Sequence, residues 1–371
     1  MALDRLLNVA RKEFSDHITS RRFVIILVLF LVISAIGMHT GIGYYNDMLE
    51  SYNQQLQYMQ ELEVDSPYVN WMPEKPSIML IFNSMMSYMT TLGGILAIAI
   101  GFDLVSKEKE TRSLKTLLSH PLYRDEIING KALGGVGALG FAIVLALAIS
   151  LAMLLLFSIV PTLEEFAAIL IFGAVSLGFL LAYFSIALMM STVARESGNA
   201  LIYTLVIFFA VSSLLPLLGT VAADVLVGDP PEPPEVGLIP TIVGRSVSAT
   251  AGGGYFVSSA SQSVVQVGSE DQVWREYEEE LRNYIDKRML ISDLTTLISP
   301  QMNYYTIAMA VTNPQITATI DALYNSGMAP EETPGLAEAL GRVWMNIAAL
   351  IVFPSVFFAV TYVKFMRMDI R

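Results

Sequence analysis

The stretch Ser106–Lys131, SKEKETRSLKTLLSHPLYRDEIINGK, decides the fold of this chain. Ten of its 26 residues are charged, whereas 54% of the whole chain is hydrophobic and only 15% is charged. Soluble domains carry about 25% charged residues. With a mean hydropathy of +0.56, the chain is therefore predicted to be an integral membrane protein. Ser106–Lys131 is then a charged connection between two long apolar segments.

Six segments around this connection are long and apolar enough to cross a bilayer. A hydrocarbon core about 30 Å thick needs roughly 20 apolar residues in a helix. Two other uncharged stretches, 246–269 and 294–320, are rich in Ser, Gly, Thr, Asn and Pro, which makes their insertion costly, and we do not count them as spans. The alternative stays open: if one of them crossed, the tail would lie on the opposite side from the amino terminus, and if both crossed, on the same side. The fold class is thus predicted as an all-α integral membrane protein with six transmembrane helices, at about 23–43, 78–104, 132–160, 166–193, 201–225 and 343–363.

The distribution of charge predicts the orientation of these helices. With the amino terminus inside, the inner side carries 15 Lys and Arg against 10 Asp and Glu, and the outer side carries 7 against 24. Short loops rich in Lys and Arg stay in the cytoplasm. Both termini are therefore predicted to be cytoplasmic, in a multi-pass protein of a prokaryotic cell membrane. The acidic outer surface is typical of adaptation to high salt, as in an archaeon, and argues against nucleic acid as a partner.

The orientation divides the remaining chain into segments on the two sides. Residues 1–22 are predicted to form an amphipathic helix in the inner membrane interface, with Arg11, Phe14, Ile18 and Arg21 as its main contact residues. Residues 44–77 would form an outer loop with an acidic helical part. Residues 228–342 would form an extracellular domain, and residues 364–371 a cytoplasmic tail.

Small residues recur every four positions in the third and fourth spans. This spacing lets helix backbones approach closely, either within the bundle or across a dimer. A flexible gate is the alternative use. The positions concerned are Gly130, Gly134 and Ala138 in the third span and Ala174, Gly178 and Ala182 in the fourth.

The second span carries one polar stripe, made by Ser84, Ser87, Tyr88 and Thr91. It faces either a substrate path or a neighbouring helix. The spans contain almost no charged residue deep in the membrane, which argues against a carrier driven by protons or ions. The chain has no cysteine and three scattered histidines, so we predict no catalytic residue, no metal site and no bound cofactor.

The charged connection cannot enter the bilayer. We expect residues 106–119 to form a short helix along the inner membrane surface, stopped by Pro121, before the chain enters the third span. Leu114, Leu117 and Leu118 would form its apolar stripe. Such a helix is a rigid lever that joins the second and third spans.

The residues of this lever resemble the cytoplasmic loop of the ABC-2 permeases, the membrane subunits of ATP-binding-cassette exporters. The similarity is greatest to the branch that contains the permease of nitrous oxide reductase maturation and archaeal multidrug permeases. The matching positions are Asp103, Glu108-x-Glu110, Leu114-x-x-Leu117-Leu118-Ser119-x-Pro121-x-x-Arg124-x-x-Ile127 and Gly130-Lys131. Arg112-Ser113-Leu114 stands where family members commonly have Gly-Thr-Leu.

The resemblance implies a permease subunit of an ABC exporter that works as a dimer, with a second copy of itself, on a separate cytoplasmic ATPase dimer. The chain has no Gly-x-x-x-x-Gly-Lys-Ser/Thr loop, so it is not expected to be an enzyme, and ATP and Mg²⁺ would be bound by the partner. The implied docking contacts are Lys107, Glu108, Glu110, Arg112 and Lys115, with Leu114 and Leu117 in a groove of the ATPase.

A second function fits the same sequence. The chain could be an ATP-driven membrane scaffold, or mechanotransmitter, that recruits an extracellular protein through residues 228–342. For a transporter, a path lined by Ser, Thr, Tyr and Met favours no single substrate: lipids, drugs, peptides and metal–sulfur species all stay open.

Overall fold

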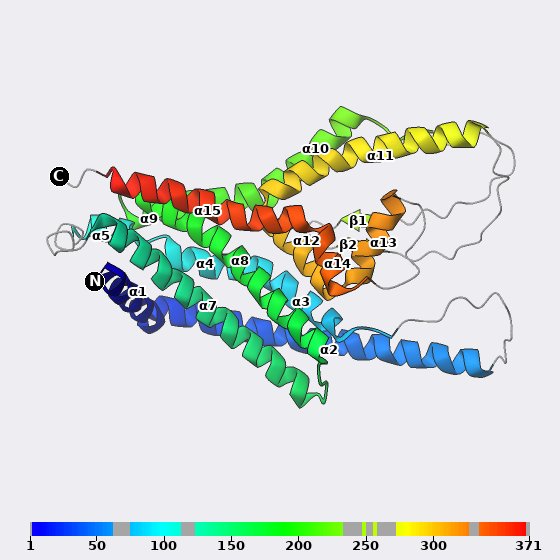
Figure 1. Cartoon of the computed structure of the whole chain (residues 1–371), viewed down its shortest axis with the longest axis horizontal. Coiled ribbons are helices and arrows are strands. Elements are labelled where there is room, and N and C mark those ends of the chain that lie inside the picture. Colours follow the sequence, from blue (N-terminus) through cyan, green and yellow to red (C-terminus); the bar gives the residue numbers. More distant parts are fainter. Residues whose placement is uncertain are drawn as a thin grey trace.

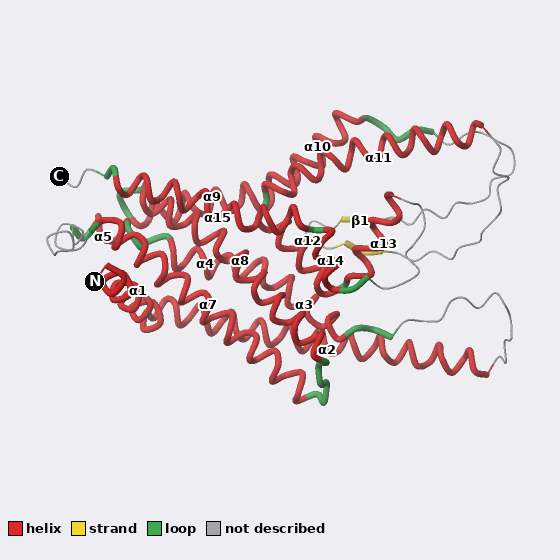
Figure 2. The backbone as a smooth tube through the Cα atoms, in the orientation of Figure 1, coloured by secondary structure: helices red, strands yellow, loops and turns green. Residues whose placement is uncertain are grey.

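The computed structural model describes residues 2–61, 75–112, 123–232, 247–249, 255–257, 272–325 and 334–368. Within these residues the fold is helical apart from one small sheet (Figures 1 and 2). In this sheet, β1 (Val247–Ala249) pairs antiparallel with β2 (Tyr255–Val257). The predicted all-α fold class is therefore confirmed, and the sheet is an addition that the sequence analysis missed.

Six helical segments of the described chain are long and apolar enough to cross a membrane, as predicted. They are α2 (Arg21–Glu61), Ile78–Glu110, α7 (Arg124–Leu156), α8 (Leu163–Val193), Ser197–Val227 and α15 (Trp344–Met366). α7 begins before the predicted residue 132, because its charged first turn is also helical. There the backbone N–H of Tyr123 donates to Glu126 Oε2 at 3.1 Å, which satisfies an N-terminal donor of the helix.

The first span is much longer than a membrane requires. α2 contains 41 residues, so at about 1.5 Å per residue it extends for roughly 60 Å, twice the thickness of a hydrocarbon core. Its carboxyl-terminal part projects past most of the bundle, at the same end as α11 (Figure 1). The predicted outer loop 44–77 therefore starts with a helix that continues the span without a break as far as Glu61.

Two of the six segments change helix type near their centres. Ile78–Glu110 consists of η1 (Ile78–Leu80), α3 (Ile81–Tyr88), η2 (Met89–Gly93), α4 (Gly94–Gly101) and α5 (Ser106–Glu110), and Ser197–Val227 consists of α9 (Ser197–Phe209), η3 (Ala210–Leu214) and α10 (Leu215–Val227). Both η2 and η3 are π-helical turns. Such turns widen a helix locally and are frequent at functional sites.

α8 lies at the centre of the bundle and carries much of the core. Its Phe172, Phe179 and Tyr183 are fully buried. The Phe172 ring lies 5.4 Å from Phe82 of α3, and the Tyr183 ring lies 4.8 Å from Phe208 of α9. Aromatic pairs at these separations add to the burial of apolar area. α8 therefore packs against both the second span, through α3, and the fifth span, through α9.

The described helices between the fifth and sixth spans lie beside and within the bundle. α11 (Gln272–Ile298) lies beside α10 (Figure 1), and Arg288 and Asp224 form an ion pair at 2.6 Å. α12 (Pro300–Thr312) follows, begun by Ser299, whose hydroxyl accepts the N–H of Met302. α13 (Pro314–Asn325) and α14 (Leu336–Arg342) then lead to α15.

Residues 294–320 are not among the candidate spanning helices of the described chain, as expected. Within this stretch, α12 is buried against the other helices of the bundle. Its Tyr304 is fully buried, and the hydroxyls of Tyr304 and Ser176 of α8 lie 3.2 Å apart. Asn303 accepts a hydrogen bond at 2.9 Å from Asn346 of α15. Tyr304 and Asn303 therefore have protein partners, as buried polar groups usually do, whereas the buried Thr312 hydroxyl has none among the described residues.

Both ends of the chain lie at the same end of the bundle (Figure 1). We call this the terminal end. It contains α1 (Ala2–Thr19), α5, and the turn between α8 and α9 at residues 191–197, called the α8–α9 turn below. The opposite end, called the loop end, contains the projecting parts of α2 and α11 (Figure 1).

Candidate functional site at the terminal end

α5 is the described part of the predicted lever. It covers Ser106–Glu110, a shorter helix than predicted, and its end is marked by Arg112, whose φ of 57° lies in the left-handed region. Such a conformation is uncommon for a residue other than glycine and ends a helical run. Residues 113–119, which the sequence analysis included in the helix, lie outside the described residues, and so do the predicted contacts Leu114, Lys115 and Leu117.

Lys109 attaches α5 to the end of α8. Its Nζ donates to the carbonyl oxygens of Ser191, Thr192 and Ala194, at 3.3 Å for Ser191 and 3.0 Å for Ala194. The last carbonyl groups of a helix have no partner within the helix, and a cation there also interacts favourably with the helix dipole. One side chain of α5 therefore completes the carboxyl terminus of the central helix.

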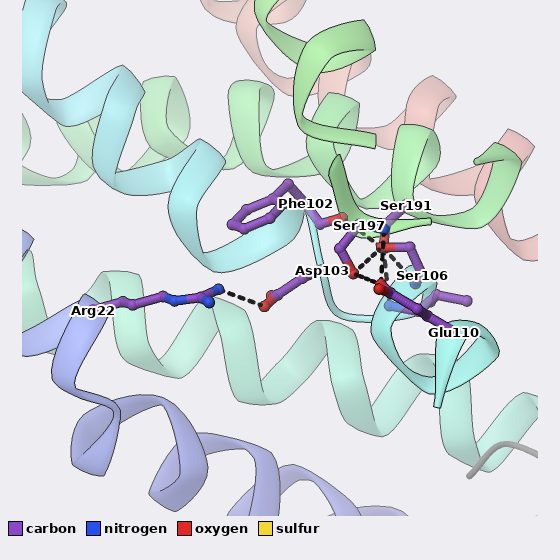
Figure 3. A network of polar contacts seen from close by, with 8 residues as sticks. Arg22, Phe102, Asp103, Ser106, Glu110, Ser191 and Ser197 are labelled. Carbon is purple, nitrogen blue, oxygen red and sulfur yellow. Dashed lines mark hydrogen bonds and ion pairs between the residues drawn. The ribbon is translucent and has the colours of Figure 1, made fainter. Parts of the chain in front are cut away.

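Serine hydroxyls and Glu110 add further contacts between α5 and the α8–α9 turn (Figure 3). Ser191 Oγ accepts the backbone N–H groups of Val105 at 2.9 Å and of Ser106 at 3.0 Å. The Glu110 carboxylate accepts the backbone N–H of Ser197 at 3.2 Å and its hydroxyl at 2.9 Å, at the start of α9. Both ends of α5, at Ser106 and at Glu110, are therefore hydrogen-bonded to the α8–α9 turn.

The opposite side of α5 contacts a buried group of charges. Lys131 of α7 is almost completely buried, and its Nζ lies 2.6 Å from Glu108 Oε1 and 2.8 Å from Glu13 Oε1 of α1. The Glu108 side chain is 15% exposed and that of Glu13 is 9% exposed. Burying charges is costly unless they are paired. One ammonium group thus pairs with carboxylates from two other helices.

α1 packs on α7 where α7 carries small residues. A Cβ added to Gly130 would lie 2.6 Å from Val9, and one added to Gly134 would lie 2.6 Å from the Cβ of Glu13. Arg5 of α1 forms an ion pair with the largely buried Glu126 at 2.9 Å. The close approach that the small residues predict is therefore made with the amino-terminal helix.

Other predicted packing residues have different neighbours. Ala138 and Ala182 are fully buried, whereas Ala174 is exposed. Gly178 faces Leu350 of α15, with an added Cβ at 3.2 Å. Gly135, which the predicted pattern did not include, lies so close to Phe184 of α8 that an added Cβ would be 2.4 Å from the ring.

The predicted interfacial residues divide into two groups. Arg11 and Arg21 are exposed, whereas Phe14 and Ile18 are partly buried. The Phe14 ring lies 6.3 Å from that of Phe141, in an edge-on arrangement. The apolar stripe of α1 therefore packs at least in part on α7, and the exposed arginines stay at the surface.

A further ion pair at the terminal end joins the start of α2 to the residues that follow α4. Arg22 lies 3.7 Å from Asp103, which precedes α5 (Figure 3). His17 of α1 is partly buried nearby, and its buried Nε2 has no hydrogen-bond partner among the described residues. Burial lowers the pKa of His17, although the negative charges of Glu13 and Asp103 act in the opposite direction. The neutral imidazole is therefore favoured at pH 7.

The predicted docking residues of α5 are placed very differently from one another. Lys107, Glu110 and Arg112 are exposed at the terminal end. Glu108, in contrast, faces Lys131 inside the protein, and Glu110 is bonded to Ser197. Lys107 and Arg112 are therefore the described residues best placed to meet another protein.

The polar stripe of the second span lies on the surface of the single chain. Ser87, Tyr88 and Thr91 are exposed, and Ser84 is partly buried. An added Cβ on Gly37 of α2 would lie 2.7 Å from Tyr88, and one on Gly94 would lie 2.8 Å from Phe208 of α9. The polar stripe therefore lies on a face of the second span between α2, which contacts Tyr88, and α9, which contacts Gly94.

Several residues of this site were not predicted as part of it. Lys109, Glu13 and Ser191 carry many of its polar contacts. Glu13 could have been noticed, because it interrupts the face of α1 formed by Ala10 and Phe14. The role of Ser191 has no signal in the sequence, since it depends on how α8 meets α5.

The fold and this site define a class before any comparison: a multi-pass helical membrane protein with a charged assembly at the terminal end. A family model described as "ABC-2 family transporter protein" matches residues 7–370. The chain therefore belongs to the ABC-2 transporter family and is a membrane permease subunit of an ABC transporter. A search of curated proteins finds no match. The predicted assignment to the ABC-2 permeases is confirmed at the level of the family.

Proposed function

We propose that this chain exports its substrate as a dimer with a second copy, driven by separate cytoplasmic ATPase subunits that dock on α5. The observation that carries this proposal is the position of α5. This short helix exposes Lys107 and Arg112 and is bonded to α8, α9 and α7, so a force on it would reach three spans at once.

The exposed polar stripe supports the dimer. Ser87, Tyr88 and Thr91 would face lipid in a single chain, where unpaired polar groups are costly. The neighbouring span Ser197–Val227 is also largely exposed, as at Val206 and Phe209. A second copy placed over this face would remove the stripe from lipid and enclose a path between the two subunits. The substrate would then cross the membrane along this path.

Charge reversal of the exposed residues tests the docking. The variant Lys107→Glu/Arg112→Glu should lose co-purification of a phosphate-loop ATPase from its host membrane, because complementary charges determine partner choice. Glu108 is unsuitable for this test, since a change there would also disturb Lys131. The matched control is Arg282→Glu/Lys287→Glu, an exposed pair on α11 at the loop end. Equal ATPase recovery from both variants would show that α5 is not the docking surface.

A membrane scaffold is the second candidate function. It is favoured by the exposed apolar residues Leu290, Leu294 and Ile298, in the part of α11 that lies beside α10. A partner protein would be recruited by such an exposed apolar surface. Replacing these three residues by Ser should abolish function in a scaffold while ATPase assembly persists. In a transporter, the same variant should keep both ATPase assembly and substrate-stimulated ATP hydrolysis.

A further inference from the structure

α5 is attached very unequally to its two neighbours. On one side, Lys109 and Glu110 bond to the α8–α9 turn, and Ser191 accepts two backbone N–H groups from the start of α5. On the other side, among the described residues, its ion pair to α7 is made by Glu108 and Lys131. The many contacts on the first side predict that α5 and the α8–α9 turn move as one unit.

The Glu108–Lys131 pair is built so that one partner can leave. Lys131 contacts Glu13 as well as Glu108, so its ammonium group stays paired when Glu108 withdraws. Glu108 Oε2 is buried and has no hydrogen-bond partner in the part of the chain that the structure describes. Withdrawal of α5 would therefore leave no buried cation unpaired and would release a carboxylate that is only half satisfied.

The same argument shows why the other side is not the place of separation. If α5 left the α8–α9 turn, the buried hydroxyl of Ser191 and the last carbonyl groups of α8 would lose their partners. Buried polar groups left unpaired are costly. Glu13 meanwhile remains held to α7 by Lys131, together with the close packing of α1 at Gly134. The terminal end is thus divided into two units, α5 with the α8–α9 turn and α1 with α7.

We propose that the Glu108–Lys131 ion pair is the releasable joint between these two units, and that Lys131 is the positioning residue that keeps α1 on α7 whether the joint is open or closed. This proposal rests on the proposed function, in which the ATPase acts on α5. ATP-driven movement of the ATPase would open or close this joint, and the movement of α5 would reach the end of the central helix α8 directly.

Spin-label distances measure the joint directly, because the chain has no native cysteine. Thr111→Cys with Ser15→Cys spans the joint, and Thr111→Cys with Glu196→Cys lies within one unit; all three positions are exposed. In the permease alone, Glu108→Gln should broaden the first distance distribution and leave the second unchanged. The matched control is Glu110→Gln, which carries the same change on the same helix and should leave the first distribution narrow. Equal broadening by both variants would overturn the proposal.

Nucleotide then tests the role of the joint in coupling. In the complex with its ATPase, a non-hydrolysable ATP analogue should shift the Thr111–Ser15 distance and leave the Thr111–Glu196 distance unchanged. A shift of both distances, or of neither, would overturn the joint as the coupling element. If no ATPase is recovered with the wild-type permease, the proposed function fails instead, and the measurement on the permease alone still decides whether the joint exists.

Discussion

At the scale of single residues, Lys131 is the buried cation at which α1, α5 and α7 meet. It is almost completely buried and pairs with two carboxylates. Lys131→Met would remove the buried cation shared by Glu13 and Glu108 and leave Glu13 only the exposed Lys12, at 3.9 Å. Breaking a buried ion pair from one side costs about 3–5 kcal/mol. We therefore expect Lys131→Met to unfold at a clearly lower temperature than the wild type, measured on the purified protein in detergent.

The control for this prediction removes the whole group of charges. In Lys131→Met/Glu13→Gln/Glu108→Gln, no buried charge is left without a partner at this position. Replacing a complete buried ion network by neutral residues is often tolerated. The triple variant should therefore regain much of the lost stability. If it is no more stable than Lys131→Met, the loss comes from packing and not from the unpaired carboxylates.

His17 predicts a dependence of stability on pH. Burial lowers its pKa in the folded protein below the value of about 6.5 expected in the unfolded chain. The unfolded state then binds the proton more readily, so this contribution to stability is present above pH 6.5 and is lost as the pH falls below it. Glu13, Asp16, Asp103 and Lys131 are the charged groups that act on the imidazole.

Thermal unfolding at pH 7.5 and pH 5.5 measures this contribution. The wild type should lose stability at pH 5.5, and His17→Gln, which cannot titrate in this range, should lose less. An identical loss in both proteins would assign the pH effect to other groups.

At the scale of secondary-structure elements, the contact between α1 and α7 depends on glycine. A Cβ at position 134 would lie 2.6 Å from Glu13 and 3.0 Å from the carbonyl oxygen of Ala10, so α1 would have to shift. Overpacking of this kind costs about 1–3 kcal/mol. Gly134→Ala should therefore lower the unfolding temperature and increase protease cleavage within α1.

Gly140 of the same helix provides the matched control. An added Cβ there meets no atom within 4 Å. Within a helix, Ala is favoured over Gly by about 0.5–1 kcal/mol. Gly140→Ala should therefore be neutral or slightly stabilising, and cleavage of α1 should not change. A similar loss in both variants would show that the packing of α1 is not the reason.

At the scale of the whole molecule, the two ends of the bundle should face opposite sides of the membrane. The charge distribution predicts that the terminal end is the cytoplasmic one. Because the chain has no cysteine, single variants report on one position each. In intact cells, a membrane-impermeant maleimide should label Glu279→Cys of α11 and leave Thr111→Cys of α5 unlabelled. Labelling of Thr111→Cys alone would reverse the orientation and remove the basis for cytoplasmic docking.

The sequence by itself determined the number and order of the spanning helices. The free energy of transferring a helix into lipid is approximately the sum of the contributions of its own residues. A local property such as hydropathy is therefore sufficient to identify a spanning helix. The same local reasoning could not give the surroundings of α12, because a sum over Ser, Asn and Tyr cannot show that Tyr304 meets Ser176. It also could not separate Glu108, which faces Lys131, from the exposed Lys107 beside it in the sequence.

Only the tertiary structure decided which charges serve the protein's own fold. Lys131 and Glu13 are 118 positions apart in the sequence, and their pairing arises only once α1 lies on the glycines of α7. The energy of a charge depends on its burial and on its partners, and both are properties of the folded chain. The apolar segments therefore determine that the chain is a membrane bundle, and the packing of α1, α5 and α7 determines how its terminal end is held together.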